Sequence, residues 1–412
     1  MKTLISHIKT IVQANTAAPE TVSGGAMRRL PCIHNGWISA DNGLISGFGE
    51  MHDAPSAAHY DQVIDAGGRL VFPAWCDPHT HLVFAGTREN EFVDRIGGLS
   101  YEEIAKKGGG ILHSAEKLNK TSEDELFQGA LSRLQEITLY GTGAVEIKSG
   151  YGLSVEAELK MLRVIKRLKE HSPLTIKATF LGAHSIPAKY KQDRQGYINL
   201  IINEMLPEIA KEKLADYCDV FCDRGFFTPD ETQAILQAGW KYGIPPKIHA
   251  NELDYSGGIQ VGVKNKALSV DHLEYTGDNE IEALRNSGTM PTLLPSTAFF
   301  LNLPYPPARK MIDAGLPLAL ATDYNPGSSP SGNMPFVISL ACVKLKMLPE
   351  EAINAATINA AYAMGLGASH GSITAGKKAS LFITKPLSNY NLLPYSFGSN
   401  LIDKVMVEGV MQ

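Results

Sequence analysis

The sequence predicts an α/β protein, a (β/α)8 TIM-like barrel with a small β-sandwich domain built from both chain ends. Three observations predict this fold. The middle of the 412-residue chain alternates eight short apolar runs with stretches of helical period, both ends carry β-type patterns, and polar residues gather where the apolar runs stop. Alternating strands and helices indicate a parallel sheet, and eight βα units are the number that closes a barrel.

The two chain ends share one kind of pattern. Up to about residue 66, apolar runs such as TLISHIKTIV and NGLISGFG alternate with turns of Gly, Asn and Asp. From about residue 372 the same character returns in SITAGKKASLFITK and LIDKVMVEGVMQ. We therefore expect residues 1–66 and 372–412 to form one small composite β domain, and residues 67–371 to form the barrel.

The middle section shows both strands and helix starts. Its eight apolar runs are LVFPAWCD, GAVEIK, LTIKATFL, YCDVFC, PKIHA, ALSVDH, TMPTLLP and LPLALATD. Three helices between them have clear N-terminal signals, because Ser122 stands three residues before Glu125, Ser154 precedes an apolar periodic stretch, and Thr228 precedes Pro229.

An open doubly wound sheet is the alternative to a closed barrel. No Gly-x-Gly-x-x-Gly follows the first run, and the glycine run at 106–111 lacks the Gly-Lys-Ser/Thr of a phosphate loop. These absences favour the barrel, and we interpret the glycine run as a mobile loop.

Composition and charge exclude several classes of protein. A formal net charge of −5, with no run of Lys and Arg among aromatic residues, is not typical of a protein that binds nucleic acid. Five scattered cysteines suit a reducing compartment, with Cys218 and Cys222 interpreted as buried thiols rather than a zinc pair. No signal-peptide pattern and no apolar stretch of about 18 residues occur. We expect a cytoplasmic protein that does not bind membranes.

Polar residues follow the predicted strands at the end where a barrel enzyme carries its active site. They are His79 and His81; Glu146, Lys148 and Tyr151; His184; His249 and Glu252; His272 and Glu274; and Asp323 and Asn325. Side chains two apart on a strand point to the same side, so His79 and His81 aim at one point. Taken alone, that pair could also lie on a solvated turn.

The combined set of strand-end residues indicates a metal site. Several imidazoles with one carboxylate suit zinc or a similar first-row metal, and a site with room for water can activate it for hydrolysis. The sequence therefore favours a metal-dependent hydrolase. A structural barrel that merely binds metal is the alternative outside enzymes.

Six motifs resemble one family. PHTHLVFAGTREN, EIKSGYGL, TFLGAH, IHANE, DHLE and ATDYNPGSSP are similar to motifs of the imidazolonepropionases, a family of the amidohydrolase superfamily. The resemblance covers nearly the whole chain. It implies an enzyme of histidine degradation that opens the cyclic amide of 4-imidazolone-5-propanoate to N-formimino-L-glutamate, by attack of a metal-bound water or hydroxide. Another amidohydrolase, such as a heterocyclic amine deaminase or a cyclic amidase, is the runner-up.

The resemblance also implies a metal centre and an assembly. One Zn²⁺ or Fe³⁺ per subunit would be held by His79, His81, His249 and Asp323, and the protein would be a homodimer. Many relatives bridge two metals with a carboxylated lysine at the end of strand four. Cys222 stands near that place here, which favours a single metal.

The remaining roles follow from the resemblance as well. Glu252, His272 and Asp323 are expected to be catalytic. Glu252 would be a proton shuttle that also faces the substrate, His272 would polarise the carbonyl or stabilise the tetrahedral oxyanion, and Asp323 would orient the water or take its proton. The residues expected to contact substrate or product are Arg88, for the propanoate carboxylate, and Tyr151, His184, Asn325, Gly327 and Ser328. Ordinary surface or strand-end ion pairs are the alternative for Arg88 and Asp323, and a solvated helix start is the alternative for Glu252.

Overall fold

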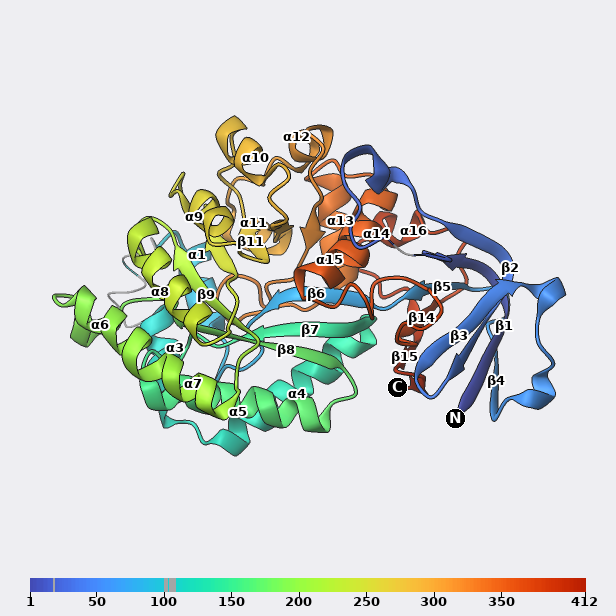
Figure 1. The fold of residues 1–412 in the computed structure, drawn as a ribbon, viewed down its shortest axis with the longest axis horizontal. Coiled ribbons are helices and arrows are strands. Elements are labelled where there is room, and N and C mark those ends of the chain that lie inside the picture. The colour runs from blue at the N-terminus through green and yellow to red at the C-terminus, as the bar shows by residue number, and fades with distance from the viewer. Residues whose placement is uncertain (18, 100–102, 104–108) are drawn as a thin grey trace.

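The fold consists of a barrel and a smaller, separate sheet, as Figure 1 shows. A computed structural model of the chain describes residues 1–17, 19–99, 103 and 109–412. Residues 106–108, the first half of the glycine run interpreted as a mobile loop, lie outside the described residues.

The barrel is made of eight parallel strands that hydrogen-bond in chain order. They are β6 (Trp75–Thr80), β7 (Thr142–Lys148), β8 (Thr175–Ala183), β9 (Tyr217–Cys222), β10 (Ile248–Ala250), β11 (Ser269–His272), β12 (Met290–Leu293) and β13 (Ala319–Leu320). The first strand meets the segment that follows the last strand where Thr80 pairs with Tyr324. This arrangement confirms the predicted (β/α)8 barrel.

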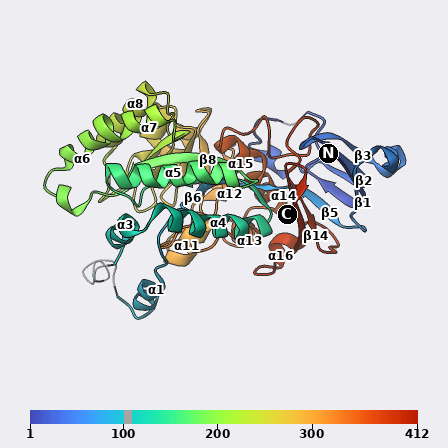
Figure 2. The same cartoon turned by 90° about the horizontal axis from the view of Figure 1, so that it is seen from below.

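Helices cover the outside of the barrel, and the predicted helix starts are confirmed. Ser122 and Glu125 exchange the two hydrogen bonds of a capping box at α4 (Glu123–Leu139), and Thr228 does the same with Glu231 at α8 (Pro229–Lys241). Ser154 caps α5 (Val155–His171) by accepting a hydrogen bond from the Ala157 amide. Figure 2 shows α4 and α5 side by side along the barrel.

The other helices complete the outer layer and the connections. They are α1 (Glu89–Ile96), α3 (Ile111–Lys120), α6 (Arg194–Leu200), α7 (Leu206–Glu212), α9 (Gly258–Lys264), α10 (Asp278–Leu284), α11 (Pro295–Leu301), α12 (Ala308–Asp313), α13 (Met334–Val343), α14 (Pro349–Ala356), α15 (Ile358–Ala363) and α16 (Leu392–Tyr395).

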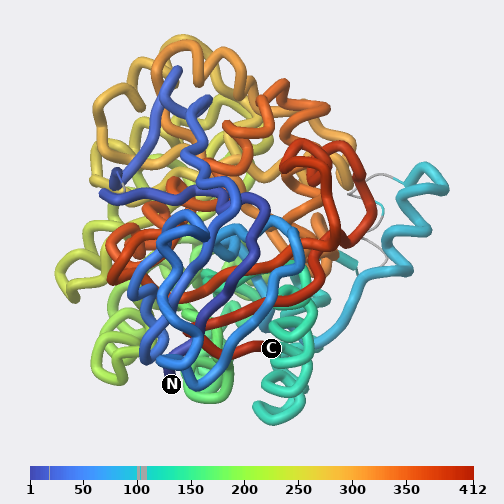
Figure 3. Tube along the Cα trace, turned by 90° about the vertical axis from the view of Figure 1, so that its right-hand side faces the viewer, coloured from blue at the N-terminus to red at the C-terminus, as the bar shows by residue number. Residues whose placement is uncertain are grey.

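The smaller sheet combines strands from both chain ends, and Figure 3 shows these blue and red segments side by side. Its strand order is β16-β15-β14-β5-β1-β2-β3, and β4 also pairs with β1. The strands are β1 (Lys2–Val12), β2 (Cys32–Asp41), β3 (Leu44–Glu50), β4 (Gln62–Asp65), β5 (Leu70–Pro73), β14 (Leu381–Thr384), β15 (Ile402–Val407) and β16 (Val410–Met411). An apolar core of its own, rich in isoleucine, stabilises it.

The run LVFPAWCD forms two strands instead of one. Its first half is β5 of the small sheet and its second half begins β6 of the barrel, so the chain crosses between the two sheets at Pro73 and Ala74. The strands of the small sheet therefore extend past residue 66. The division of the chain at 66/67 and 371/372 stays a prediction.

Two sequence interpretations outside the barrel can be compared with the structure. All five cysteines are free thiols, and Cys218 and Cys222 are both buried in the main hydrophobic core. None of the helices in the described part of the chain is long and apolar enough to cross a membrane.

Three aromatic rings join the small sheet to the barrel. The ring of Phe382 on β14 stacks on Phe72, with 5.0 Å between centroids, and lies 4.7 Å from the ring of Trp75. All three residues are fully buried.

We expect Phe382→Ala to lower the free energy of unfolding by about 3 kcal/mol or more, because it leaves a cavity at this junction. Urea denaturation of the variant and the parent protein measures the difference. Phe397→Ala is the matched control, since Phe397 is 71% exposed and its removal should change the free energy by less than about 0.5 kcal/mol. Equal losses in the two variants would contradict this account.

Candidate metal and active site

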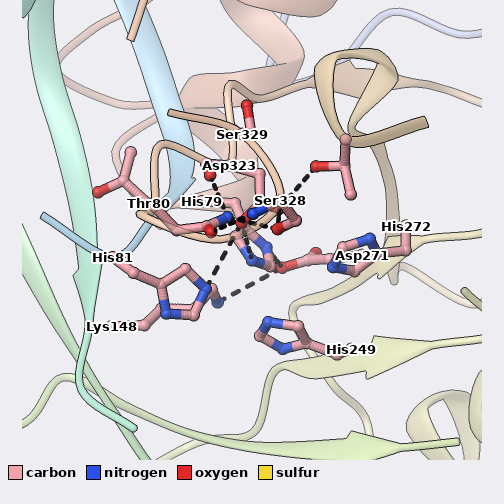
Figure 4. Close-up of polar contacts among 12 residues, drawn as sticks. His79, Thr80, His81, Lys148, His249, Asp271, His272, Asp323, Ser328 and Ser329 are labelled. Atoms are coloured by element: carbon pink, nitrogen blue, oxygen red, sulfur yellow. Dashed lines mark hydrogen bonds and ion pairs between the residues drawn. The ribbon is translucent and has the colours of Figure 1, made fainter. Parts of the chain in front are cut away.

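Three imidazoles converge at the carboxyl ends of the barrel strands. His79 lies on β6, His81 follows that strand and His249 lies on β10, and one ring nitrogen from each is within 4.8 Å of the others. Figure 4 shows the three rings turned toward one region. All three residues are buried. The predicted convergence of these histidines is therefore present.

Asp323 completes this group from the last strand end. Its Oδ1 lies 3.5 Å from Nε2 of His79 and 3.6 Å from Nε2 of His81. Its Oδ2 accepts hydrogen bonds from the hydroxyls of Thr297, at 2.6 Å, and Ser328, at 3.3 Å. The backbone of Asp323 has a φ of +54°, a left-handed conformation that Asp tolerates better than most residues and that turns the chain into the next loop.

Two buried carboxylates orient the imidazoles from behind. Nδ1 of His79 lies 2.7 Å from Asp271, and Nδ1 of His249 lies 3.0 Å from Asp219. An imidazole that donates its Nδ1 proton to a carboxylate presents an unprotonated Nε2 on the other side, as metal-binding histidines do. Nε2 of His79 is buried and has no hydrogen-bond partner.

The residues present fit a metal ion. Three imidazoles and one carboxylate are a set of ligands that zinc and other first-row metals prefer. Nε2 of His79 is buried without a hydrogen-bond partner, so it is free to bind a metal ion. Burial also lowers the pKa of His79 and His81 well below the usual value. Both rings are therefore neutral and able to bind a metal at neutral pH.

Cys222 takes no part in this group. It is fully buried in the main hydrophobic core, and burial raises the pKa of its thiol to about 11. A protonated thiol is a poor metal ligand.

Glu252, His272 and Glu274 form a second cluster beside the imidazoles. Nδ1 of His272 lies 3.7 Å from Oε2 of Glu252 and 4.0 Å from Oε2 of Glu274. Burial, followed by the charges of Asp323 and Asp223, raises the pKa of Glu252 to about 8. Burial raises the pKa of Glu274 well above its usual value, and the charge of Glu252 adds to that effect. Glu252 can therefore exchange a proton near neutral pH.

Arg88 and Tyr151 lie together on another side of the site. The guanidinium carbon of Arg88 is 6.0 Å from the Tyr151 ring, and its Nε donates a hydrogen bond to Ser114 at 2.9 Å. A Cβ at position 327 would lie 2.5 Å from Nη1 of Arg88, closer than real Cβ atoms approach, so Gly327 leaves room for this cation. Nη1 of Arg88 therefore lies against the loop at Gly327.

His184 connects this side to the imidazoles. Its ring stacks on His81, with 5.4 Å between centroids, and lies 5.5 Å from the ring of Tyr151. Its Nδ1 lies 3.1 Å from the carbonyl oxygen of Gly150. Burial lowers the pKa of His184 to about 3, so the ring is neutral.

Asn325 shapes the loop that follows Asp323. Its Oδ1 accepts hydrogen bonds from the amides of Gly327 and Ser328, both at 2.8 Å. Its Nδ2 donates to the carbonyl oxygen of Asp323 and to the Ser328 hydroxyl, both at 2.7 Å. The side chain of Asn325 therefore holds Gly327 and Ser328 in place beside the site.

The structure adds residues to which sequence reasoning gave no role. Asp219, Asp271 and Thr297 contact the proposed metal ligands, and Lys148 lies between the two aspartates. Lys148 stood out only as a strand-end residue. The available signal was the interruption of apolar strands by an acid, DVF in β9 and VDH in β11.

A comparison with known protein families matches residues 70–411 to the family described as the amidohydrolase family. Two similar curated proteins are imidazolonepropionases. The one from Flavobacterium johnsoniae is 60% identical over 409 residues, 99% of both chains. The one from Brevibacillus brevis is 41% identical and covers 99% of this chain and 97% of its own.

Similar solved structures confirm the fold. A triazine hydrolase variant has a TM-score of 0.75 at 14% identity, covering 100% of this chain and 94% of its own. A guanine deaminase from C. acetobutylicum with bound guanine has a TM-score of 0.72 at 14% identity, covering 100% of both chains. The fold, the family match and the close relatives agree, and the chain belongs to the amidohydrolase family and, within it, to the imidazolonepropionases.

Proposed function

We propose that this hydrolase of histidine degradation opens the cyclic amide of 4-imidazolone-5-propanoate at the site formed by His79, His81, His249 and Asp323, giving N-formimino-L-glutamate. The convergence of three buried imidazoles and one carboxylate from three different strand ends carries this proposal. The family membership supports both the reaction and the substrate.

His79, His81, His249 and Asp323 would hold one metal ion. When bound, a first-row metal supplies a Lewis acid that makes water acidic enough to yield hydroxide near neutral pH. Either zinc or iron satisfies this donor set. Oδ2 of Asp323 already accepts hydrogen bonds from Thr297 and Ser328. The carboxylate of Asp323, held in this way, would orient the attacking water.

The ring opening requires one water molecule. The water oxygen forms a bond to the carbonyl carbon, the bond from that carbon to the ring nitrogen breaks, and a proton from the water ends on the ring nitrogen. Glu252 would carry this proton, since its pKa of about 8 lets it both accept and release a proton near neutrality. His272, 3.7 Å from Glu252, would polarise the carbonyl.

The substrate would lie between these groups and Arg88. The planar guanidinium of Arg88 matches the two oxygens of the propanoate carboxylate. Tyr151 and His184 would contact the ring, and the loop shaped by Asn325 would bring Gly327 and Ser328 against the amide end.

We further propose a cytoplasmic homodimer, as the family resemblance implies, and sedimentation velocity tests the dimer.

Metal removal tests the proposed centre. We expect a chelator to abolish turnover of 4-imidazolone-5-propanoate, and zinc or iron added back to restore it. Elemental analysis should find one metal ion per chain, and His79→Ala should lose it because one imidazole ligand is gone. His113→Ala, which removes an exposed imidazole on α3, serves as the control and should keep the metal. Full turnover by the metal-free protein would refute this proposal.

The pH dependence tests the proton carrier. As a base Glu252 acts in its ionised form, so kcat/KM should rise with pH, reach half its maximum near pH 8 and level off above it. His272, Glu274, Asp323 and Asp223 surround Glu252 and also titrate or carry charge. The assignment therefore rests on Glu252→Gln, which should remove the limb near pH 8 and lower kcat by about 100-fold or more. An unchanged limb in this variant would show that another group carries the proton.

Arg88→Ala tests recognition of the substrate carboxylate. We expect kcat/KM for 4-imidazolone-5-propanoate to fall about 10- to 100-fold, the worth of a charge-assisted hydrogen bond. Steady-state kinetics with an imidazolone that lacks the carboxylate provide the control, and the parent protein and Arg88→Ala should turn this compound over equally. For 4-imidazolone-5-propanoate, kcat/KM of Arg88→Lys should lie between those of the parent and Arg88→Ala, because lysine keeps the charge without the planar fork. Equal losses with both compounds would point to a different role for Arg88.

A further inference from the structure

A fully buried lysine lies behind the proposed metal ligands. Lys148 ends strand β7, and its Nζ lies 2.7 Å from Oε1 of Glu146, 2.8 Å from Oδ2 of Asp219 and 3.4 Å from Oδ2 of Asp271. All four side chains have no exposure to solvent. A dashed line in Figure 4 marks the ion pair of Lys148 with Asp271. The reaction as proposed above uses none of these charges directly.

The two aspartate oxygens that face Lys148 are the same atoms that face the imidazoles. Oδ2 of Asp219 lies 3.0 Å from Nδ1 of His249, and Oδ2 of Asp271 lies 2.7 Å from Nδ1 of His79. One ammonium therefore bridges the two carboxylates that orient two imidazoles of the site. From β7, Lys148 thus connects through Asp219 on β9 to His249 on β10. Through Asp271 on β11 it connects to His79 on β6.

The ammonium donates hydrogen bonds to Glu146 and Asp219 and forms an ion pair with Asp271. An ammonium has three N–H donors, and three carboxylates surround this one. Burial acts to lower the pKa of Lys148, but the charges of Asp219, Glu146 and Asp271 outweigh it and raise the pKa above its usual value. Lys148 is therefore a permanent cation, available neither as a metal ligand nor as a base.

The neighbouring Lys247 has a different set of contacts. Its Nζ contacts Glu146 and donates to the carbonyl oxygens of Pro78, at 3.0 Å, and Ala363, at 3.1 Å. Lys247 thus secures Glu146 and the backbone next to His79, while Lys148 contacts both aspartates. The charge of Lys247 also acts on Asp271, but Lys148 is the cation that contacts both aspartates. Without this contact, two buried like charges would repel strongly at low dielectric.

We infer that Lys148 is a positioning residue of the metal centre, which holds Asp219 and Asp271 so that His249 and His79 turn their Nε2 atoms toward one ion. This inference rests on the proposed metal site and names a residue that acts on it from behind. Groups that orient metal-binding histidines in this way change metal affinity when they are removed.

Lys148→Met tests the inference, because it keeps the length of the side chain and removes the charge. We expect the dissociation constant for zinc, measured by competition with a chromophoric chelator, to rise about 10- to 100-fold. The visible absorption spectrum of the cobalt-substituted protein should also change, since it reports ligand geometry directly. Neither measurement depends on turnover.

Lys177→Met is the matched control. Lys177 lies on the adjacent strand β8, where it pairs with Asp216 at 3.3 Å and is one-quarter exposed. This variant should keep the zinc affinity and the cobalt spectrum of the parent protein. An equal effect of Lys148→Met and Lys177→Met would overturn the inference, because the loss of any lysine from a barrel strand would then weaken zinc binding to the same extent.

Lys148→Arg keeps the test decisive if Lys148→Met does not fold. Arginine retains the charge, but its larger planar fork cannot meet three oxygens from three strands at the positions that Nζ occupies. A folded Lys148→Arg protein with weaker zinc binding and an altered cobalt spectrum supports the inference. Either folded variant of Lys148 with parental zinc affinity and spectrum would refute it. If the parent protein itself bound no metal, the proposed function would fail instead.

Discussion

The closure of the barrel between β6 and β13 is the constraint on which the site depends. The amide of Asp323 donates to the carbonyl oxygen of His79 at 3.0 Å, and the amide of His81 donates to the carbonyl oxygen of Tyr324 at 2.9 Å. The backbone bonds that close the barrel are thus made by the proposed metal ligands and their neighbour. A chain separation of more than 240 residues is reduced to hydrogen-bond distance, and the ligand geometry follows from the register of the strands.

The charged groups behind the ligands show how such a site can be buried at all. Carboxylates and ammonium groups lose several kcal/mol each when they leave water, and only close pairing offsets that cost. Glu146, Asp219 and Asp271 are paired with Lys148, and Glu146 is also paired with Lys247. By contrast, the carboxylate oxygens of Glu274 and Nδ1 of His272 have no hydrogen-bond partner, although they lie 4.0 Å apart at their nearest. Satisfied groups support the site from behind, and unsatisfied ones face the place where substrate and water would lie.

The sequence predicts the parts of this arrangement that local rules control. Alternation of apolar runs and helical stretches predicts the barrel, the two-residue spacing predicts that His79 and His81 share a side, and Ser122 and Thr228 predict helix starts. The pairing of His79 with Asp271 spans 192 residues. It depends on strand register, so no local sequence pattern predicts it. The division of LVFPAWCD between two sheets has the same cause, since an apolar run is equally compatible with either sheet.

The elements that carry each group divide the work of the site. The proposed metal ligands stand on strands or directly after them, where backbone hydrogen bonds on both sides limit their movement, whereas Arg88 stands outside the barrel wall at the start of α1. A metal centre needs fixed distances, and strands provide them. Recognition of one substrate needs a group that can differ among proteins of the same fold, and loops tolerate such change. The solved structures with TM-scores of 0.72 and 0.75 at 14% identity show that this fold persists when most of the sequence has changed.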